Sequence, residues 1–252
     1  MTLRNKTALI TGASRGIGRA IARSYAAAGA TLILHYHRDR KSAEQSRADL
    51  AGDGHIMLKA DLSNPAECQR LVEGAVLGAG QLDIVVNNAG HFSPHPPATA
   101  SFEEWQTAWT QTLGVNLVGA AHVAYWSAQD MIKSGGGRIV NISSRGAFRG
   151  EPDAPAYGAS KAGLNAMSQS MARALAPHNI LVFAVAPGWV DTDMAKPLLT
   201  GPQGDEIRNQ SPFKRIALPE EIAQVALFLA SDAPAFMSGC LIDVNGASYL
   251  RT

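Results

Sequence analysis

Cysteine and long apolar runs are scarce in this chain of 252 residues. The two cysteines, Cys68 and Cys240, have no metal-like or redox partner at short spacing, which argues against a disulfide scaffold or a cysteine metal site. The apolar stretch Ile180–Ala186 is far shorter than the roughly 20 residues that a membrane-spanning helix needs. We therefore expect a globular protein with no membrane partner.

Excess charge is also lacking, because 22 Lys and Arg residues face 21 Asp and Glu residues, which gives a net charge of +1. With no basic tail, nucleic acid and anionic membrane surfaces are not expected as partners. The first predicted strand begins at Thr7, which leaves no room for a signal peptide. With so few cysteines, this predicts a reduced, cytoplasmic setting.

Short apolar runs alternate with helical patterns along the whole chain, which is typical of a parallel sheet covered by helices on both faces. Strands are predicted at Thr7–Thr11, Thr31–Tyr36, His55–Ala60, Ile84–Asn87, Gly137–Ser143, Ile180–Ala186 and Cys240–Val244. Helices are predicted near Gly16–Ala28, Ser42–Ala51, Pro65–Gly78, Phe102–Lys133, Ala156–Ala176 and Pro219–Ala230. We therefore predict an α/β, doubly wound Rossmann fold with a seven-stranded parallel sheet, as a single domain over residues 1–252.

Ligands of open parallel sheets bind beyond the carboxyl ends of the strands. Segments rich in loop-forming residues follow three of the predicted strands. Substrate loops are therefore predicted near residues 91–100, 145–156 and 189–215.

A glycine-rich turn, Gly12–Gly18, follows the first predicted strand at once and leads into a helix that ends before Gly29. Glycines let the backbone approach a pyrophosphate closely, and a helix N-terminus offers free N–H groups and the positive end of a dipole. The spacing differs from the general G-x-G-x-x-G dinucleotide fingerprint. The turn predicts a phosphate-binding loop, with an ordinary tight turn as the alternative.

Tyr157 and Lys161 are four residues apart in a predicted helix, so their side chains share one face. A phenol has a pKa near about 10, and a nearby cation lowers it by favouring the phenolate. Such a Tyr can exchange a proton with an alcohol or ketone oxygen. The alternative is an exposed Tyr beside a surface Lys.

These motifs together resemble the signature set of the short-chain dehydrogenase/reductase family, in its single-domain branch. The resemblance covers nearly the whole chain and rests on Thr11–Gly18, Asn87–Gly90, Asn116, Ser144, Tyr157-x-x-x-Lys161 and Pro187-Gly188. One departure is Asn245-Gly-Ala247, where the family usually has Asp-Gly-Gly. We expect this departure to affect packing or assembly rather than chemistry.

The resemblance implies four catalytic residues: Asn116, Ser144, Tyr157 and Lys161. Ser144 would hydrogen-bond the carbonyl oxygen, Tyr157 would transfer the proton, and Lys161 would hold the ribose hydroxyls and lower the Tyr157 pKa. Asn116 would break its helix locally and hold a water that links Lys161 to solvent, with a plain polar helix residue as the alternative. Ser143 competes with Ser144, but neighbours on a strand face opposite ways, so only one can face substrate.

The resemblance also implies the cofactor contacts. Asp61 would contact adenine, with a helix N-terminal acid as the alternative, and Asn87 and Ala89 would line the adenosine ribose. Pro187-Gly188 would lie beside the nicotinamide, and Thr192 would hold its carboxamide or cap a helix. The full expected set is Gly12, Arg15, Gly16, Ile17, Gly18, His37, Arg38, Asp61, Leu62, Asn88, Ala89, Gly90, Tyr157, Lys161, Pro187, Gly188, Val190 and Thr192.

The end of the second predicted strand indicates which cofactor is preferred. An acidic residue there binds the ribose hydroxyls of NAD(H), but this chain has Tyr36 followed by His37 and Arg38. Arg15 could approach a 2′-phosphate from the other side, since Arg grips phosphate through two hydrogen bonds. We expect Asp39 to lie past the strand end, facing solvent. The pattern predicts NADP(H) preferred over NAD(H), with a solvated basic turn as the alternative.

The sequence therefore predicts an NADP(H)-dependent oxidoreductase that interconverts a ketone and a secondary alcohol. The chain is similar in outline to 3-oxoacyl-[acyl carrier protein] reductases, and another small carbonyl (a sugar, terpenoid or aromatic ketone) is the alternative substrate. The rival from another class is a cofactor-sensing protein without turnover. We expect no metal, because the histidine pairs His35/His37 and His91/His95 lack accompanying cysteines or carboxylates. The family resemblance also implies a homotetramer.

Overall fold

A sheet of seven parallel strands forms the centre of the protein. In the computed structural model, which describes residues 1–251, the strand order is β3-β2-β1-β4-β5-β6-β7. The strands are β1 (Thr7–Ile10), β2 (Thr31–Tyr36), β3 (Ile56–Lys59), β4 (Ile84–Asn87), β5 (Gly137–Ile142), β6 (Ile180–Pro187) and β7 (Leu241–Val244). This confirms the predicted doubly wound sheet. The order reverses between β1 and β4, where such sheets open a crevice for ligands.

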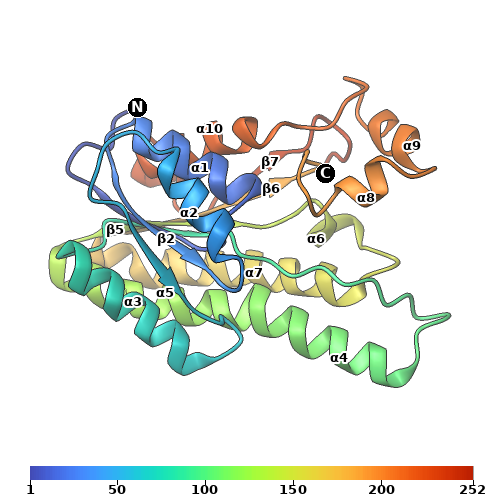
Figure 1. Cartoon of the computed structure of the whole chain (residues 1–252), viewed down its shortest axis with the longest axis horizontal. Coiled ribbons are helices and arrows are strands. Elements are labelled where there is room, and N and C mark those ends of the chain that lie inside the picture. The colour runs from blue at the N-terminus through green and yellow to red at the C-terminus, as the bar shows by residue number, and fades with distance from the viewer. Residues whose placement is uncertain (252) are drawn as a thin grey trace.

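Both faces of the sheet are buried, because successive strand residues are apolar and point to opposite sides. Ile10, Leu34 and Val86 pack into one core with helices α1 and α10. Their neighbours Leu9 and Val85 pack into a second core with α3 and α5. Figure 1 shows these helix layers above and below the sheet.

The helices follow the strands in the expected alternation. They are α1 (Gly16–Ala27), α2 (Arg40–Ala48), α3 (Pro65–Ala79), α4 (Phe102–Leu113), α5 (Ala120–Ser134), α6 (Gly146–Arg149), α7 (Pro155–Leu175), α8 (Lys196–Leu199), α9 (Gly204–Asn209) and α10 (Pro219–Ala230). Short 3₁₀ turns lie at Ala176–His178 and Ala235–Met237. No helix within residues 1–251 is both long enough and apolar enough to cross a membrane.

The helix predicted over Phe102–Lys133 is interrupted around Asn116, where the family resemblance implied a local break. A π-helical turn, Gly114–Gly119, separates α4 from α5. Gly119 packs so tightly against the Leu62 carbonyl that a Cβ there would collide with it. Within the turn, the Asn116 side chain bonds to the backbone of His91. Turns of this kind are frequent at functional sites, where they re-aim side chains.

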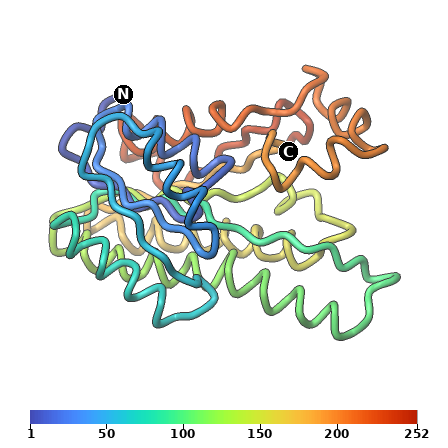
Figure 2. The backbone as a smooth tube through the Cα atoms, in the orientation of Figure 1, coloured from blue at the N-terminus to red at the C-terminus, as the bar shows by residue number. Residues whose placement is uncertain are grey.

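The three predicted substrate loops all lie beyond the carboxyl ends of strands, after β4, β5 and β6. Two of them contain short helices: α6 follows β5, while α8 and α9 follow β6. Ala195, Leu199 and Ile207 hold α8 and α9 together in a small apolar cluster against Trp189. In Figure 2 the orange α8–α9 segment stands out to one side of the sheet.

Candidate active site

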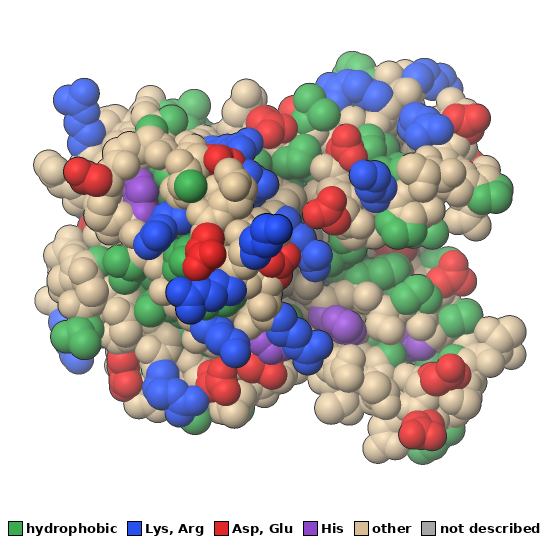
Figure 3. All heavy atoms as spheres, in the orientation of Figure 1, with side chains coloured by type: hydrophobic (Ala, Val, Ile, Leu, Met, Phe, Trp, Pro, Cys, Tyr) green, Lys and Arg blue, Asp and Glu red, His purple; other side chains and the backbone are tan. Residues whose placement is uncertain are grey.

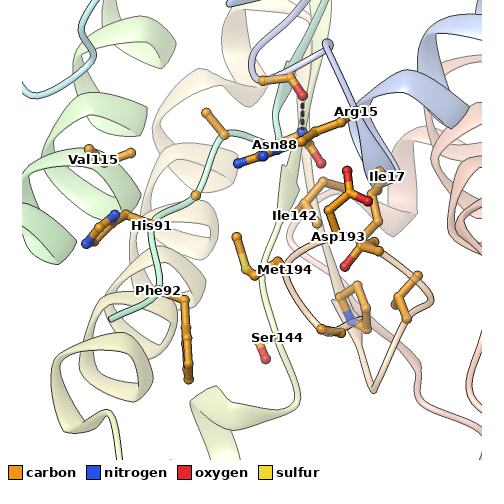
Figure 4. Close-up of a pocket in the computed structure, with 18 of the residues that line it drawn as sticks. Arg15, Ile17, Asn88, His91, Phe92, Val115, Ile142, Ser144, Asp193 and Met194 are labelled. Atoms are coloured by element: carbon orange, nitrogen blue, oxygen red, sulfur yellow. Dashed lines mark hydrogen bonds between the residues drawn. The ribbon is translucent and has the colours of Figure 1, made fainter. Parts of the chain in front are cut away.

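A cleft of about 610 Å³ lies at the carboxyl ends of the central strands. Such a volume lies within the range of cofactor and ligand sites. The glycine turn, the ends of β2, β4 and β5, and the segment after β6 all contribute walls. Of the expected site residues, Gly18, Asn87 and Asn116 do not line it, and the Asn87 side chain is buried instead. Figure 4 shows Phe92, Ser144 and Met194 bordering the same space.

The glycine turn is locked to the end of β4 by hydrogen bonds. The Thr11 hydroxyl accepts from the N–H groups of Asn88 (2.9 Å) and Ala89 (3.0 Å). The Asn88 amide donates to the carbonyls of Thr11 (2.9 Å) and Gly12 (3.1 Å), and the latter bond is drawn in Figure 4. Gly12 has φ +65°, and a Cβ there would come within 2.9 Å of the Ala89 Cα, so only glycine fits.

The N-terminus of α1 is suited to an anion. No side chain caps it and its first turn holds no acidic residue, whereas Asn64 caps α3 and Ser101 caps α4. The free N–H groups and the helix dipole therefore face the cleft without a competing carboxylate. These features fit the pyrophosphate of a dinucleotide cofactor.

His35 is a structural residue of this turn that sequence reasoning missed. Its Nδ1 accepts from the Gly12 N–H (3.1 Å), and its Nε2 bonds the Ala60 carbonyl (3.0 Å), so the imidazole joins β2, the turn and the end of β3. Burial lowers the His35 pKa to about 4, so the ring is neutral at ordinary pH. The sequence placed His35 inside the predicted strand Thr31–Tyr36, but nothing in the sequence indicated its bonds to Gly12 and Ala60.

Cationic side chains gather where the cleft passes β2 and α2. Arg15, His37 and Arg38 line the cleft there, and Figure 3 shows Lys and Arg side chains grouped on this face beside the hollow. Two carboxylates, those of Asp39 and Asp61, also line this part of the cleft. Asp39 is exposed, as expected, and caps α2 by accepting from the N–H and hydroxyl of Ser42.

Asp61 is engaged in a similar way. Its Oδ1 accepts from the N–H (2.9 Å) and hydroxyl (2.7 Å) of Ser63, and these bonds lower its pKa. Its Oδ2 lies 3.6 Å from the His37 Nε2. Asp61 therefore lines the cleft and holds the turn before α3, while Asn64 is the N-cap of that helix; the contact of Asp61 with adenine stays a prediction.

The two adjacent serines both line the cleft, but their hydroxyl groups are engaged differently. Ser143 is buried, and its hydroxyl donates to the Lys161 carbonyl (3.3 Å). Ser144 lines the cleft, and its Oγ accepts from the Gly146 N–H (3.0 Å). The Ser144 hydroxyl also lies close enough to the Tyr157 hydroxyl to favour its phenolate form through a hydrogen bond.

Tyr157 and Lys161 both line the cleft, with the Lys161 Nζ 5.7 Å from the centre of the Tyr157 ring. Nζ donates to the Ile142 carbonyl (2.8 Å). Burial raises the Tyr157 pKa to about 12, which the neighbouring Ser144 hydroxyl only partly opposes, and lowers the Lys161 pKa to about 8. The expected lowering of the Tyr157 pKa is thus outweighed by desolvation in this structure.

Asn116 lies behind the cleft rather than in its wall. Its Oδ1 accepts from the His91 N–H (2.7 Å), and its Nδ2 donates to the His91 carbonyl (2.9 Å) and the Ser160 hydroxyl (3.1 Å). The amide therefore joins the π-helical turn to the loop after β4 and to α7.

His95 is a second residue that sequence reasoning missed. It is buried, its Nδ1 bonds the Ser93 carbonyl (2.7 Å), and its Nε2 accepts from the Ala156 N–H (3.2 Å) in the first turn of α7. Its ring packs edge-on against Trp105. His95 therefore fixes the start of the helix that carries Tyr157. Both its nitrogens are occupied, so the His91/His95 pair does not form a metal site.

Arg145 ties the substrate side together. Its guanidinium donates to the Ser248 hydroxyl (2.5 Å) and to Gln210 Oε1 (2.9 Å), which also accepts from the Trp189 indole (3.2 Å). The departure at Asn245-Gly-Ala247 immediately precedes Ser248. The departure therefore lies next to a residue that bonds Arg145, and its effect on packing rather than chemistry stays a prediction.

Comparisons with known proteins agree with this geometry. A family model described as Enoyl-(Acyl carrier protein) reductase matches residues 12–247. The 3-oxoacyl-[acyl-carrier-protein] reductase FabG of Aquifex aeolicus is 38% identical over 98% of this chain and 98% of its own length. The D-threitol dehydrogenase of Mycolicibacterium smegmatis is 35% identical over 99% of this chain and 95% of its own length.

A solved structure is similar as well. A crystal structure described as a short-chain alcohol dehydrogenase from Sinorhizobium meliloti 1021 superposes with a TM-score of 0.90, at 34% identity, over 98% of this chain and 97% of that one. Likeness of this extent covers the glycine turn, the Tyr-Lys helix and the loops around the cleft. The chain belongs to the short-chain dehydrogenase/reductase family and is an NAD(P)-dependent oxidoreductase.

Proposed function

We propose that this protein interconverts a ketone and a secondary alcohol with NADP(H) as its preferred cofactor. The observation that carries the proposal is that Ser144, Tyr157 and Lys161 line the same cleft as the glycine turn. A cleft that joins a proton donor to a phosphate-binding turn suits hydride transfer coupled to proton transfer.

Each side chain has a role that its surroundings favour. The nicotinamide supplies or accepts the hydride. Ser144, which lines the cleft beside Tyr157, donates a hydrogen bond to the carbonyl oxygen as negative charge develops there. Tyr157 gives its proton to that oxygen in reduction and takes the proton back in oxidation. Lys161 holds the ribose hydroxyls and favours the phenolate electrostatically once the site is closed.

Asn116 acts through its neighbours in this proposal. Its amide fixes the loop at His91 and the helix at Ser160, and so supports the position of Lys161 on that helix. The predicted water between Asn116 and Lys161 would carry protons to solvent. Gly90 lies between the two residues: a Cβ built there would lie 3.7 Å from Asn116 Oδ1 and 3.9 Å from the Lys161 Nζ, and glycine leaves that space open for the water.

The preference for NADP(H) rests on Arg15 and Arg38. Both line the cleft, and β2 ends in Tyr36 rather than a carboxylate. The carboxylates of Asp39 and Asp61 line the same part of the cleft, but they accept hydrogen bonds from Ser42 and Ser63 respectively. A 2′-phosphate would therefore meet two guanidinium groups, which hydrogen-bond phosphate in pairs.

A second candidate substrate is a 3-oxoacyl thioester of acyl carrier protein. The observation that favours it is the likeness to 3-oxoacyl-[acyl-carrier-protein] reductases, such as FabG of Escherichia coli, which is 36% identical over 99% of this chain. The cleft wall formed by Phe92, Trp189 and Met194 suits either an acyl chain or a small apolar ketone.

A screen of ketones, sugars and acyl thioesters with NADPH tests the proposal, with the absorbance of the reduced nicotinamide as readout. Turnover of at least one carbonyl is expected. A protein that binds NADPH but reduces none of them would instead be the cofactor-sensing protein that we consider the rival.

We also propose a homotetramer. The exposed apolar side chains Phe102, Val118 and Tyr125 lie on and between α4 and α5, and Phe236 and Leu250 flank β7. Buried against copies of the chain, they would form two interfaces. Light scattering at micromolar concentration should give four times the chain mass, and a monomeric mass would contradict this.

A further inference from the structure

Glu151 is a carboxylate on the substrate side of the cleft to which the proposed mechanism gives no role. It follows α6, between Ser144 and Tyr157 in the chain, and it lines the cleft with both. Only 19% of its side chain is exposed. It is therefore a largely desolvated acid beside the reacting groups.

Its position is built into the turn after β5. A Cβ at Gly146 would collide with the Glu151 carboxyl group, so the glycine leaves room for it. The N–H of the same glycine bonds the Ser144 hydroxyl (3.0 Å). The charge of Glu151 also contributes to the raised pKa of Tyr157. The carboxylate therefore lies close to both Ser144 and Tyr157.

No hydrogen bond to the Glu151 carboxylate forms among residues 1–251; its nearest cation is the Arg149 guanidinium, at 3.8 Å. The other shielded acids differ. Asp83, with an 11% exposed side chain, accepts from Lys6 (2.8 Å) and from the Thr7 N–H (2.9 Å). Glu151 therefore has an ion pair with Arg149 but no hydrogen-bond donor among these residues, and its carboxylate can accept a hydrogen bond from a ligand in the cleft.

The charges around Glu151 restrict what that ligand can be. Burial raises its pKa, and Arg149 and Arg145 oppose the rise. A substrate ammonium group would meet these two guanidiniums, so a cation is disfavoured. A neutral hydroxyl can donate to the carboxylate without that repulsion.

We propose that Glu151 is a substrate-recognition residue that accepts a hydrogen bond from a hydroxyl group close to the reacting carbon. The substrates are then hydroxyketones and the matching polyols rather than plain ketones or acyl thioesters. This inference rests on the proposed oxidoreductase function and names the substrate class of the same site. It adds a bond between substrate and protein and requires no further chemical step.

The test compares 3-hydroxy-2-butanone with 2-butanone, which differ by one hydroxyl, in the wild type and in Glu151→Met. The wild type should favour the hydroxyketone in kcat/KM, and Glu151→Met should reduce that preference by at least about tenfold, mainly through KM, because a bond to a charged acceptor is lost. Glu151→Gln, which keeps an uncharged acceptor, should fall between. Glu103→Gln removes an exposed carboxylate in the first turn of α4 that does not line the cleft, and should leave the preference unchanged.

Calorimetric titration of 2,3-butanediol and 2-butanol into the cofactor-bound protein gives a second readout that needs no turnover. Tighter binding of the diol in the wild type, lost in Glu151→Met, supports the assignment. A failure to reduce any carbonyl would contradict only the proposed function and leave this binding result valid. If Glu151→Met instead lowered kcat/KM or affinity equally for both members of each pair and also lowered the melting temperature, the assignment would be overturned. Glu151 would then be only a structural partner of Arg149.

Discussion

The cofactor half of the cleft (residues 11–18, 35–39 and 87–90) is held largely through backbone groups, whereas the substrate half (residues 145–151 and 189–210) is held by long side chains. Thr11 and His35 bond main-chain groups of the glycine turn and the β4 end. On the other side, Arg145 reaches Gln210, which also binds Trp189. The cofactor half is therefore specified by the shape of the backbone, and the substrate half by the identity of its side chains. Substitutions in the substrate half can thus change substrate choice while the cofactor site is kept.

The largest effect should come from Tyr157→Phe, at the junction of the two halves. The change removes only the hydroxyl and keeps the edge-on contact with Phe92. Turnover should fall at least about 1000-fold, because the proton donor is lost. Cofactor affinity, measured by fluorescence titration, should stay within a few-fold. A variant with a tenth of wild-type activity would show that another group transfers the proton.

A pH profile should give the next largest effect. Alcohol oxidation requires the Tyr157 phenolate, and burial raises the pKa of this phenol to about 12. The phenolate fraction therefore grows up to about tenfold per pH unit below the pKa, so kcat/KM for oxidation should rise between about pH 6 and about pH 9. Ketone reduction uses the protonated phenol, so the Tyr157 pKa gives it no slope over that range; it should fall only above about pH 8, where Lys161, whose pKa is about 8, loses its charge. A flat profile for oxidation would contradict the assignment.

The comparison between the halves is sharpened by a pair of variants. Thr11→Val is nearly isosteric but leaves buried N–H groups without their acceptor, so it should lower stability by about 1–3 kcal/mol and weaken NADPH binding. Gln210→Ala removes the acceptor of Arg145 and Trp189 and should change the substrate KM instead. Urea denaturation measures the stability of each variant, and the NADPH dissociation constant and the substrate KM measure the two halves separately. If both variants altered both constants alike, the two halves would not be independent.

The smallest effect should come from Ala247→Gly, which restores the family's glycine beside the substrate half. Ala247 has φ +55°, a conformation that costs a non-glycine residue roughly 1–2 kcal/mol. Glycine relieves this but gains freedom in the unfolded chain, so the net stabilisation should be about 0.5 kcal/mol. Ala166→Gly, at an exposed position within α7, should destabilise instead. Destabilisation by both would mean that the strain at Ala247 is negligible.

Local patterns were enough to predict part of this molecule. The alternation of apolar runs predicted all seven strands, and the spacing of Tyr157 and Lys161 placed both in one cleft. These features depend on neighbours within a few residues, which a sequence displays directly.

Other features depend on partners far along the chain and leave no local pattern. His95 caps α7 at a residue 61 positions later, and Arg145 meets Ser248 across 103 positions. The family resemblance implied the break at Asn116, but not the bond of its side chain to His91, 25 positions earlier. Burial at Tyr157 likewise follows from packing, so the rise of its pKa could not be read from the Tyr-x-x-x-Lys spacing.

The most direct test of this account is the ratio of kcat/KM for NADPH and NADH with one carbonyl substrate. Because Arg38 lines the cleft, the wild type should prefer NADPH by at least about tenfold, and Arg38→Asp should abolish or reverse the preference. Arg40→Asp makes the same charge change at a residue that pairs with Glu44 and does not line the cleft, and should leave the ratio unchanged. Wild-type preference for NADH, or a ratio that Arg38→Asp does not move, would contradict the account.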